Sequence, residues 1–231
     1  MVAALAPVGR IERVTLGDRV YEELRDLIIG GELAPGDKLS LRSVADTLGV
    51  SIMPVREAVS RLVGDEALAV LPNRAVSVPA MTLAKFRELT RIRLVVECYA
   101  AEQAAASRQA ADLRVMTAFD AAFRREARSE RPDPARAVRA NKDLHFAVYR
   151  ASRMPSLVAV IEGLWLKIGP VLNLDLKTSP ERLAGGGAEV HHARVLAAIE
   201  AGDDGAAGRA LAADIEGAAV FIEATGRLAP D

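Results

Sequence analysis

Residues 41–62 read LRSVADTLGVSIMPVREAVSRL and decide the fold of the first part of the chain. Ser40 can accept a backbone N–H as an N-cap, and apolar residues then recur at the i, i+3, i+4 and i+7 spacing of one helix face. Gly49 tolerates positive φ, which lets one helix end sharply and another begin within a few residues. Ser51 is expected to cap the second helix, and Pro54 lies in its first turn, where a missing N–H leaves no helical bond unmade. Two short amphipathic helices around a tight turn predict a helix-turn-helix.

The second helix of this unit carries its apolar face on Val55, Ala58, Val59 and Leu62. The opposite side faces outward, and the N-terminal end of such a recognition helix meets base edges in the major groove. The residues that we expect to contact DNA, from this unit and from the turn that follows it, are Arg42, Ser51, Ile52, Met53, Arg56, Arg61, Asn73 and Arg74.

The segments on either side extend this unit. Residues 1–15 have no periodicity and are expected to form a tail, and an apolar stripe from Thr15 to Gly30 predicts a first helix. After the helix-turn-helix, residues 67–71 and 76–78 are short β-capable runs around a turn. Strand, turn and strand directly after a helix-turn-helix predict a wing, and Arg74 at its tip would enter the minor groove, where a narrow groove attracts arginine.

Composition sets the class of protein and limits its partners. Hydrophobic residues make up 51% of the chain and aromatic ones only 4%, with much Ala, Leu, Glu and Arg, which favours a mostly α protein. The net charge is −1, so DNA binding has to depend on where charges lie. The single cysteine, Cys98, rules out an intramolecular disulfide and a cysteine metal knuckle. No signal peptide or long apolar run is evident, so we expect a soluble cytoplasmic protein with no membrane contact.

The remainder of the chain is helical in almost every window. Helices are expected over residues 82–107, 110–127, 135–151, from 154 onward, 188–201 and 204–226. Gly185–Gly187 has no strand before it, so we interpret it as a flexible loop rather than a phosphate-binding loop. We therefore predict a winged helix-turn-helix domain over residues 16–79 and a bundle of about six helices over residues 80–231.

The first part of the chain resembles the N-terminal winged helix of the GntR family of bacterial transcription regulators. The resemblance is carried by GGELAPGDKLSLRSVADTLGVSIMPVREAVSRL and by LPNRAVSV. It implies recognition by Arg42 and Arg56, with Asn73 and Arg74 in the wing. This chain departs from the family pattern at Ile52, where an arginine is usual, and at Glu66 and Ala75, where glycines are expected. A lost arginine removes a guanine donor worth about 1–3 kcal/mol of discrimination, and Ile52 could instead touch a thymine methyl.

The second part is similar to the helical FCD effector domain of the FadR branch of that family. Arg93-x-x-x-Glu97, an N-x-x-x-H pattern before YRAS, GLWLKIGPVLN and HARVLAAIEAGD carry the similarity. It implies a divalent metal site at Asn141, His145, His192 and Asp214. The family pattern has Asp at the first of these positions and His at the last, so one carboxylate has changed place. The set suits Zn²⁺, Ni²⁺, Mn²⁺ or Fe²⁺, with no organic cofactor. The alternative is a metal-free pocket lined by buried polar residues.

Other residues near this predicted pocket have two interpretations each. Arg93 could clamp an effector carboxylate with two parallel hydrogen bonds, or it could pair with Glu97 four residues later on its helix. His191 would point away from its neighbour His192 and is interpreted as a surface histidine. Trp165 is interpreted as a core residue. The predicted effector-binding residues are Arg93, Asn141, His145, His192 and Asp214.

These patterns predict a ligand-responsive transcription regulator and not an enzyme. We expect a repressor of a catabolic operon that is released by a small carboxylate metabolite, with two protomers presenting their winged helices to a pseudo-palindromic operator on double-stranded DNA. One alternative is a metal-dependent enzyme in which His145, His192 and Asp214 activate a water. Another is a DNA-binding dimer whose helical domain has lost its ligand.

Overall fold

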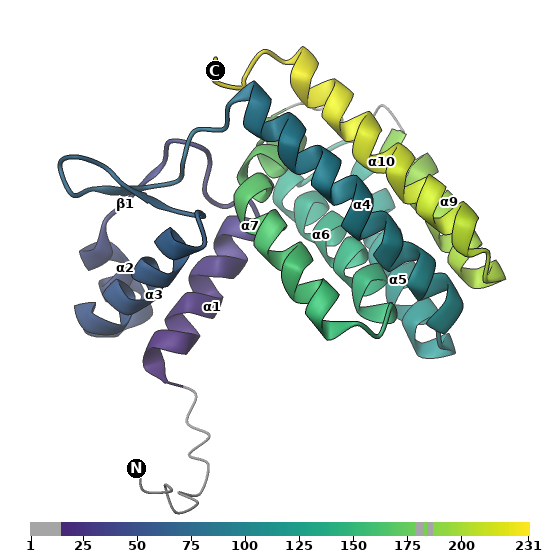
Figure 1. The fold of residues 1–231 in the computed structure, drawn as a ribbon, viewed down its shortest axis with the longest axis horizontal. Coiled ribbons are helices and arrows are strands. Elements are labelled where there is room, and N and C mark those ends of the chain that lie inside the picture. Colours follow the sequence, from purple (N-terminus) through teal and green to yellow (C-terminus); the bar gives the residue numbers. More distant parts are fainter. Residues whose placement is uncertain (1–14, 179–182, 184–186) are drawn as a thin grey trace, which may run out of the picture.

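The computed structural model describes residues 15–178, 183 and 187–231. Figure 1 shows a small N-terminal lobe beside a larger bundle of long helices. The predicted mostly α fold with a small sheet is confirmed. Residues 1–14 of the predicted tail lie outside the described residues, as do Gly185 and Gly186 of the predicted loop, whereas Gly187 begins a helix.

The helices of the small lobe begin and end at the residues that the sequence marks. Its elements are α1 (Leu16–Ile29), β1 (Lys38–Leu39), α2 (Leu41–Leu48), α3 (Ile52–Gly64), β2 (Ala69–Val70) and β3 (Val76–Ser77). Thr15 and Asp18 form a capping box at the start of α1. Ser40 caps α2, which ends at Gly49 with φ of 64°. Ser51 occupies the N-cap position of α3, but its side chain makes no cap hydrogen bond, so the predicted side-chain cap is wrong.

The core of this lobe lies between α1 and α3. Ile28 from α1 and Val55, Ala58 and Leu62 from α3 have no exposed surface. Burying a Val, Leu or Ile side chain stabilises the fold by about 1.5–3 kcal/mol. The predicted apolar face of α3 is therefore confirmed, and its packing leaves the opposite face of α3 toward solvent.

A three-stranded antiparallel sheet completes the winged helix. The strand order is β1-β3-β2, with Lys38 paired to Ser77 and Ala69 paired to the same Ser77. The predicted strands at 67–71 and 76–78 are present but shorter, and β1 was not predicted. Strand β1 has only two residues between a turn and the cap of α2, which is too short for an alternating pattern.

The larger lobe consists of helices whose predicted positions are confirmed within about two residues. They are α4 (Leu83–Ser107), α5 (Ala110–Ala127), α6 (Pro134–Ala151), α7 (Pro155–Thr178), α9 (Gly187–Ala201) and α10 (Asp204–Ala224). Asp133 caps α6 by accepting from two backbone N–H groups, and Pro134 takes the first helical position. Helices α4 and α10 run side by side along one face of the bundle (Figure 1).

Helix α7 joins the two lobes. It packs against α4 and α6 in the bundle and also against α1 of the winged helix. Gly169 of α7 lies so close to α1 that a Cβ there would be 3.3 Å from the backbone of Ile29. The stretch Pro155–Asn173 of α7 has a mean hydropathy of 1.4, and by length and composition alone it could cross a membrane. Within the described residues, α7 packs against four helices, α1, α4, α6 and α10.

Candidate DNA interface and effector site

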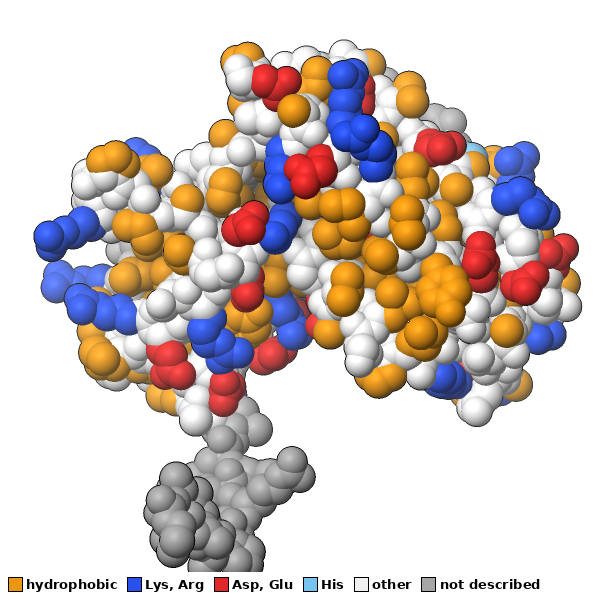
Figure 2. Space-filling view, in the orientation of Figure 1, with side chains coloured by type: hydrophobic (Ala, Val, Ile, Leu, Met, Phe, Trp, Pro, Cys, Tyr) orange, Lys and Arg blue, Asp and Glu red, His pale blue; other side chains and the backbone are white. Residues whose placement is uncertain are grey.

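The outward face of α3 is exposed at its N-terminal end. Met53 is 65% exposed and Ile52 is 37% exposed. Arg56 on α3 and Arg42 on α2 are exposed as well, and within the described residues neither side chain has a hydrogen bond or an ion pair. Figure 2 shows Lys and Arg side chains projecting from the edge of the small lobe that lies away from the bundle. The guanidinium groups of Arg42 and Arg56 are therefore available to contact phosphates or base edges.

Arg61 makes two contacts with α1. Its Nη1 lies 2.7 Å from Oδ1 of Asp18, and its guanidinium lies over the ring of Tyr21 at 4.0 Å. Both partners belong to α1, so Arg61 holds α1 against α3. Arg61 differs in this respect from Arg42 and Arg56, because its guanidinium is engaged by partners within the protein.

The wing ends in a tight turn with Asn73 and Arg74 exposed at its tip. The Oδ1 of Asn73 accepts the N–H of Ala75 at 3.1 Å, which shapes the turn. Arg74 has φ of 63°, and Glu66 has φ of 59°. Both values lie in the left-handed region that glycine adopts most easily. This backbone conformation explains why the family pattern has a glycine at position 66. Glu66 adopts it at a cost in free energy, because a residue with a Cβ disfavours positive φ.

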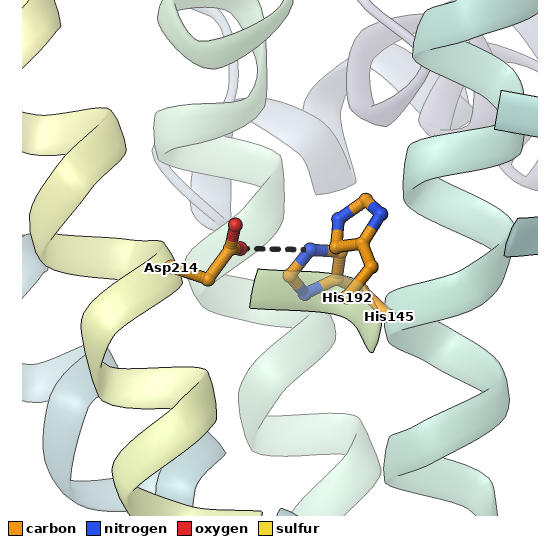
Figure 3. A group of neighbouring side chains, drawn as sticks. All are labelled: His145, His192 and Asp214. Atoms are coloured by element: carbon orange, nitrogen blue, oxygen red, sulfur yellow. Dashed lines mark ion pairs between the residues drawn. The ribbon is translucent and has the colours of Figure 1, made fainter. Parts of the chain in front are cut away.

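Three potential metal ligands meet inside the larger lobe. His145 from α6, His192 from α9 and Asp214 from α10 each offer a ligand atom, and these atoms lie within 4.8 Å of one another. All three residues are buried. Figure 3 shows the side chains converging from their separate helices, with the His145–Asp214 pair marked. These three predicted residues therefore do lie together, and Asn141 lines a cavity that His145 and Asp214 also line.

The geometry of this cluster fits a divalent ion. Nε2 of His145 lies 3.3 Å from Oδ2 of Asp214. Two ligand atoms bound to one tetrahedral zinc at about 2.0–2.2 Å are about 3.4 Å apart. Neither ring nitrogen of His192 has a hydrogen-bond partner, although the side chain is 2% exposed. A buried imidazole without a partner is costly, and a metal ion bound to that ring would remove the cost.

Burial keeps His192 in the form that binds metals. The pKa of His192 is lowered to about 4, chiefly because burial penalises the imidazolium. The neutral ring therefore predominates at pH 7. Nδ1 of His192 lies 3.8 Å from Oδ1 of Asp120, and Arg124 holds the other oxygen of Asp120 at 2.7 Å. A carboxylate behind a histidine ligand is a common support for metal binding.

Arg93 is paired with Glu97, as one of the two interpretations expected. Its Nε donates to Oε1 of Glu97 at 2.6 Å and its Nη2 donates to Oε2 at 3.1 Å. Glu97 also accepts from Trp165 and from Tyr149, and Tyr149 contacts Nδ1 of His145 at 3.0 Å. Arg93 lines the cavity at the same time, so an effector carboxylate would have to share this guanidinium with Glu97.

The cavity beside the cluster is small. It has a volume of about 30 Å³ and is lined by residues of α4, α6, α7, α9 and α10. That is room for one or two water molecules and not for an organic acid. Trp165 and Leu172 of α7 form part of its wall. A larger ligand would therefore have to displace one or more of these helices.

Two supporting residues of the site were not predicted. Tyr149 lies four residues after His145 on α6, and this spacing is the only sequence signal for the contact between them. Asp120 lies on α5, far from His192 in sequence, and nothing in its own stretch marks it. Trp165 was interpreted as a core residue, and it is 1% exposed and also donates to Glu97.

A winged helix with exposed arginines, joined to a helical bundle with a buried polar cavity, is the architecture of a one-component transcription regulator. Residues 16–78 match the family described as bacterial regulatory proteins, gntR family, and residues 88–217 match the FCD domain. The HTH-type transcriptional regulator McbR of Escherichia coli is 33% identical over 165 residues, which is 71% of this chain and 74% of McbR. The gluconate operon transcriptional repressor of Bacillus subtilis is 31% identical over 99 residues, which is 43% of this chain and 40% of that protein.

Solved structures agree with these matches. The structure of E. coli McbR/YncC has a TM-score of 0.84 at 29% identity, covering 93% of this chain and all of that one. A putative GntR regulator from Rhodococcus sp. RHA1 has a TM-score of 0.73 at 27% identity, covering 90% of this chain and 97% of that one. The chain belongs to the GntR family and carries the FCD domain of its FadR-like branch. Both matched domains are those of transcription regulators, which removes the support for the enzyme alternative.

Proposed function

We propose that this regulator is a repressor whose hold on operator DNA is released by a small carboxylate bound in the helical lobe. The observation that carries the proposal is the double role of α7. Trp165 and Leu172 on this helix line the cavity, while Gly169 packs against α1 of the winged helix. An effector that enlarges the cavity would move α7, and α1 would follow. Such a ligand acts because it prefers one arrangement of the two lobes over the other.

We further propose that His145, His192 and Asp214 hold a divalent cation, with Asn141 as a weaker oxygen ligand. Two imidazoles and one carboxylate suit Zn²⁺, Ni²⁺, Mn²⁺ or Fe²⁺ and leave positions open for water or an effector carboxylate. The cation would supply a positive charge for that carboxylate. Arg93 lies on the same cavity and adds a second positive group.

The proposed contacts with double-stranded operator DNA come from the exposed face of α3 and from the wing. They are Arg42, Ser51, Ile52, Met53, Arg56, Asn73 and Arg74. Such a regulator would act in the cytoplasm, where its operator lies. The proposal is tested by a gel shift of the promoter beside its own gene, at low salt, with added Zn²⁺ or with a chelator. A retarded band that a carboxylate weakens supports it, and no band under any of these conditions contradicts it.

We also propose a homodimer formed through the helical lobe. Ile92, Val95 and Tyr99 repeat at the i, i+3 and i+7 spacing on α4 and are 39%, 70% and 44% exposed. This spacing places them on one helix face. Figure 2 shows hydrophobic side chains gathered on the helical lobe on the side where α4 lies. Contiguous exposed apolar surface is typical of an interaction site, and a two-fold pair would present two winged helices to two half-sites.

A DNA-binding dimer without a ligand is the second candidate. Its support is the small size of the cavity and the presence of Asn141 where the family pattern has Asp. Metal analysis of the purified protein separates the two. Bound metal, or a rise in melting temperature with a carboxylate, favours the ligand-responsive regulator, and the absence of both favours the dimer without a ligand.

A further inference from the structure

Glu97 accepts hydrogen bonds from three different side chains. Arg93 donates to both of its oxygens, at 2.6 and 3.1 Å, and Nε1 of Trp165 donates to Oε1 at 3.2 Å. The hydroxyl of Tyr149 donates to Oε2. Glu97 has no exposed surface. A buried carboxylate is tolerated when a cation and further donors satisfy its oxygens, as they do here.

This arrangement fixes the proton of Tyr149. A tyrosine hydroxyl has one proton to donate, and here it is directed to Glu97. The hydroxyl oxygen can then only accept from its second neighbour, which is Nδ1 of His145 at 3.0 Å. Nδ1 of His145 must therefore carry a proton.

The tautomer of His145 decides what its other nitrogen can do. With the proton on Nδ1, the neutral ring has a bare lone pair on Nε2. That lone pair faces Oδ2 of Asp214 at 3.3 Å. Two lone pairs at this distance repel each other unless a proton or a cation lies between them. Hydrogen bonding of the distal nitrogen commonly fixes the tautomer of histidine ligands and raises their basicity.

We propose that Glu97 and Tyr149 are positioning residues of the metal site, because they hold the proton of His145 on Nδ1 and so present Nε2 to a divalent cation. This inference rests on the proposed role of His145 as a metal ligand. We call the hydrogen-bond chain from Glu97 through Tyr149 to His145 the relay. Arg93 supports the relay, because its positive charge compensates the buried carboxylate of Glu97. His192 lacks an equivalent direct contact, because Asp120 is 3.8 Å from its Nδ1. A direct contact therefore fixes the proton position of His145, whereas His192 has no such contact.

The first test is a Zn²⁺ or Co²⁺ titration of the metal-free, full-length protein followed by calorimetry. Tyr149→Phe removes only the hydroxyl and should weaken binding about 10- to 100-fold, as losses of supporting residues do. Tyr21→Phe is the matched control, because it also removes a tyrosine hydroxyl, one that donates to Asp65 at 2.8 Å in the winged helix. It should bind like the wild type. Tyr149→Phe binding as tightly as the wild type would overturn the relay and leave the proposed metal site intact.

The second test locates the ring proton of His145 directly and leaves Glu97 and Tyr149 unchanged. Long-range ¹H–¹⁵N spectra of the wild-type protein at pH 8 report which ring nitrogens are protonated, and a His145→Gln sample assigns the signal among the three histidines. A proton on Nδ1, with or without one on Nε2, supports the relay. A proton on Nε2 alone overturns it. If the wild type binds neither metal, the proposed metal site fails, while this spectrum of the metal-free protein still decides whether the relay exists.

Discussion

The side-chain amide of Asn173 on α7 donates a hydrogen bond to the main-chain carbonyl of Ile29, the last residue of α1, at 2.7 Å. Asn173 is 1% exposed and Ile29 is 3% exposed. The carbonyls at a helix C-terminus lack intrahelical partners, and this one is satisfied by the other lobe instead of by water. Leu172, the neighbour of Asn173, lines the cavity beside the His145–Asp214 pair. The bond therefore connects the cavity wall to the winged helix.

Asn173→Ala should weaken the coupling between the two lobes. The variant leaves the Ile29 carbonyl buried without a donor, which costs about 1–3 kcal/mol, and it removes the link through which α7 moves α1. We expect operator affinity in the absence of metal and effector to stay within a few fold of the wild type. The change in operator affinity on adding Zn²⁺ or a carboxylate should become smaller, as measured by fluorescence anisotropy with labelled operator.

The control for this prediction is Lys167→Ala. Lys167 pairs with Glu66 across the same junction at 3.2 Å, but the Glu66 side chain is 65% exposed. Solvent-exposed pairs contribute little, so coupling should persist in this variant. A wild-type response to ligand in Asn173→Ala would show that the hydrogen bond does not transmit the signal.

Gly31→Ala should destabilise the protein more than an ordinary loop substitution. Gly31 has φ of +67°, and a Cβ there would lie 2.0 Å from Cβ of Asn173. The left-handed backbone costs a residue with a side chain about 1–2 kcal/mol, and the steric conflict adds about 1–3 kcal/mol. Gly36→Ala isolates the first contribution, because Gly36 has φ of +89° with nothing within 4 Å. Urea unfolding should show a clearly larger loss for Gly31→Ala, and equal losses would contradict the close contact.

The helices could be predicted because their signals are local. Gly49 ends α2 and Asp133 begins α6 through conformations and caps that depend on adjacent residues only. The lengths of the two predicted strands were overestimated, because strands of two residues are defined by their pairing partners rather than by their own residues. Side-chain roles that depend on tertiary packing could not be predicted. Arg61 reaches Asp18, 43 residues away, and only the docking of α1 on α3 brings them together.

The candidate site was predicted as a set of residues but not as a network. The family resemblance located His145, His192 and Asp214, which do converge. It did not indicate that Tyr149 reaches Glu97 across 52 residues, because that contact depends on how α6 packs against α4. Residues that act through another residue leave no spacing pattern when they lie on different helices.

Val95→Asp should convert the proposed dimer into monomers. Val95 is 70% exposed and lies at the centre of the α4 stripe. A carboxylate placed in an apolar interface would be desolvated without a partner, which costs several kcal/mol. Multi-angle light scattering after gel filtration should report half the wild-type mass. Val115→Asp on α5, at a residue that is 47% exposed, is the control and should leave the mass unchanged. A wild-type mass for Val95→Asp would place the interface elsewhere.

Ile52→Arg should change which operator the protein prefers. Ile52 is exposed at the N-terminus of α3, at the position where the family pattern has arginine. The substitution adds a guanidinium that can donate two hydrogen bonds to guanine, worth about 1–3 kcal/mol at that base pair. Selection from a randomised operator library should enrich guanine at one position in each half-site for the variant. The same consensus for variant and wild type would show that residue 52 does not reach the bases.

Arg56→Ala should abolish specific binding, while Arg61→Ala should not. Both arginines lie on α3, but Arg56 has no partner within the described residues, whereas Arg61 is held by Asp18 and Tyr21 of α1. Loss of a base contact removes about 1–3 kcal/mol of discrimination and leaves the salt-dependent phosphate term. Arg61→Ala should instead lower the melting temperature slightly, because it loses an exposed ion pair and the contact with the Tyr21 ring. Competition titrations with operator and random DNA compare the two variants. Specific binding retained by Arg56→Ala and lost by Arg61→Ala would mean that a different face of α3 meets the operator.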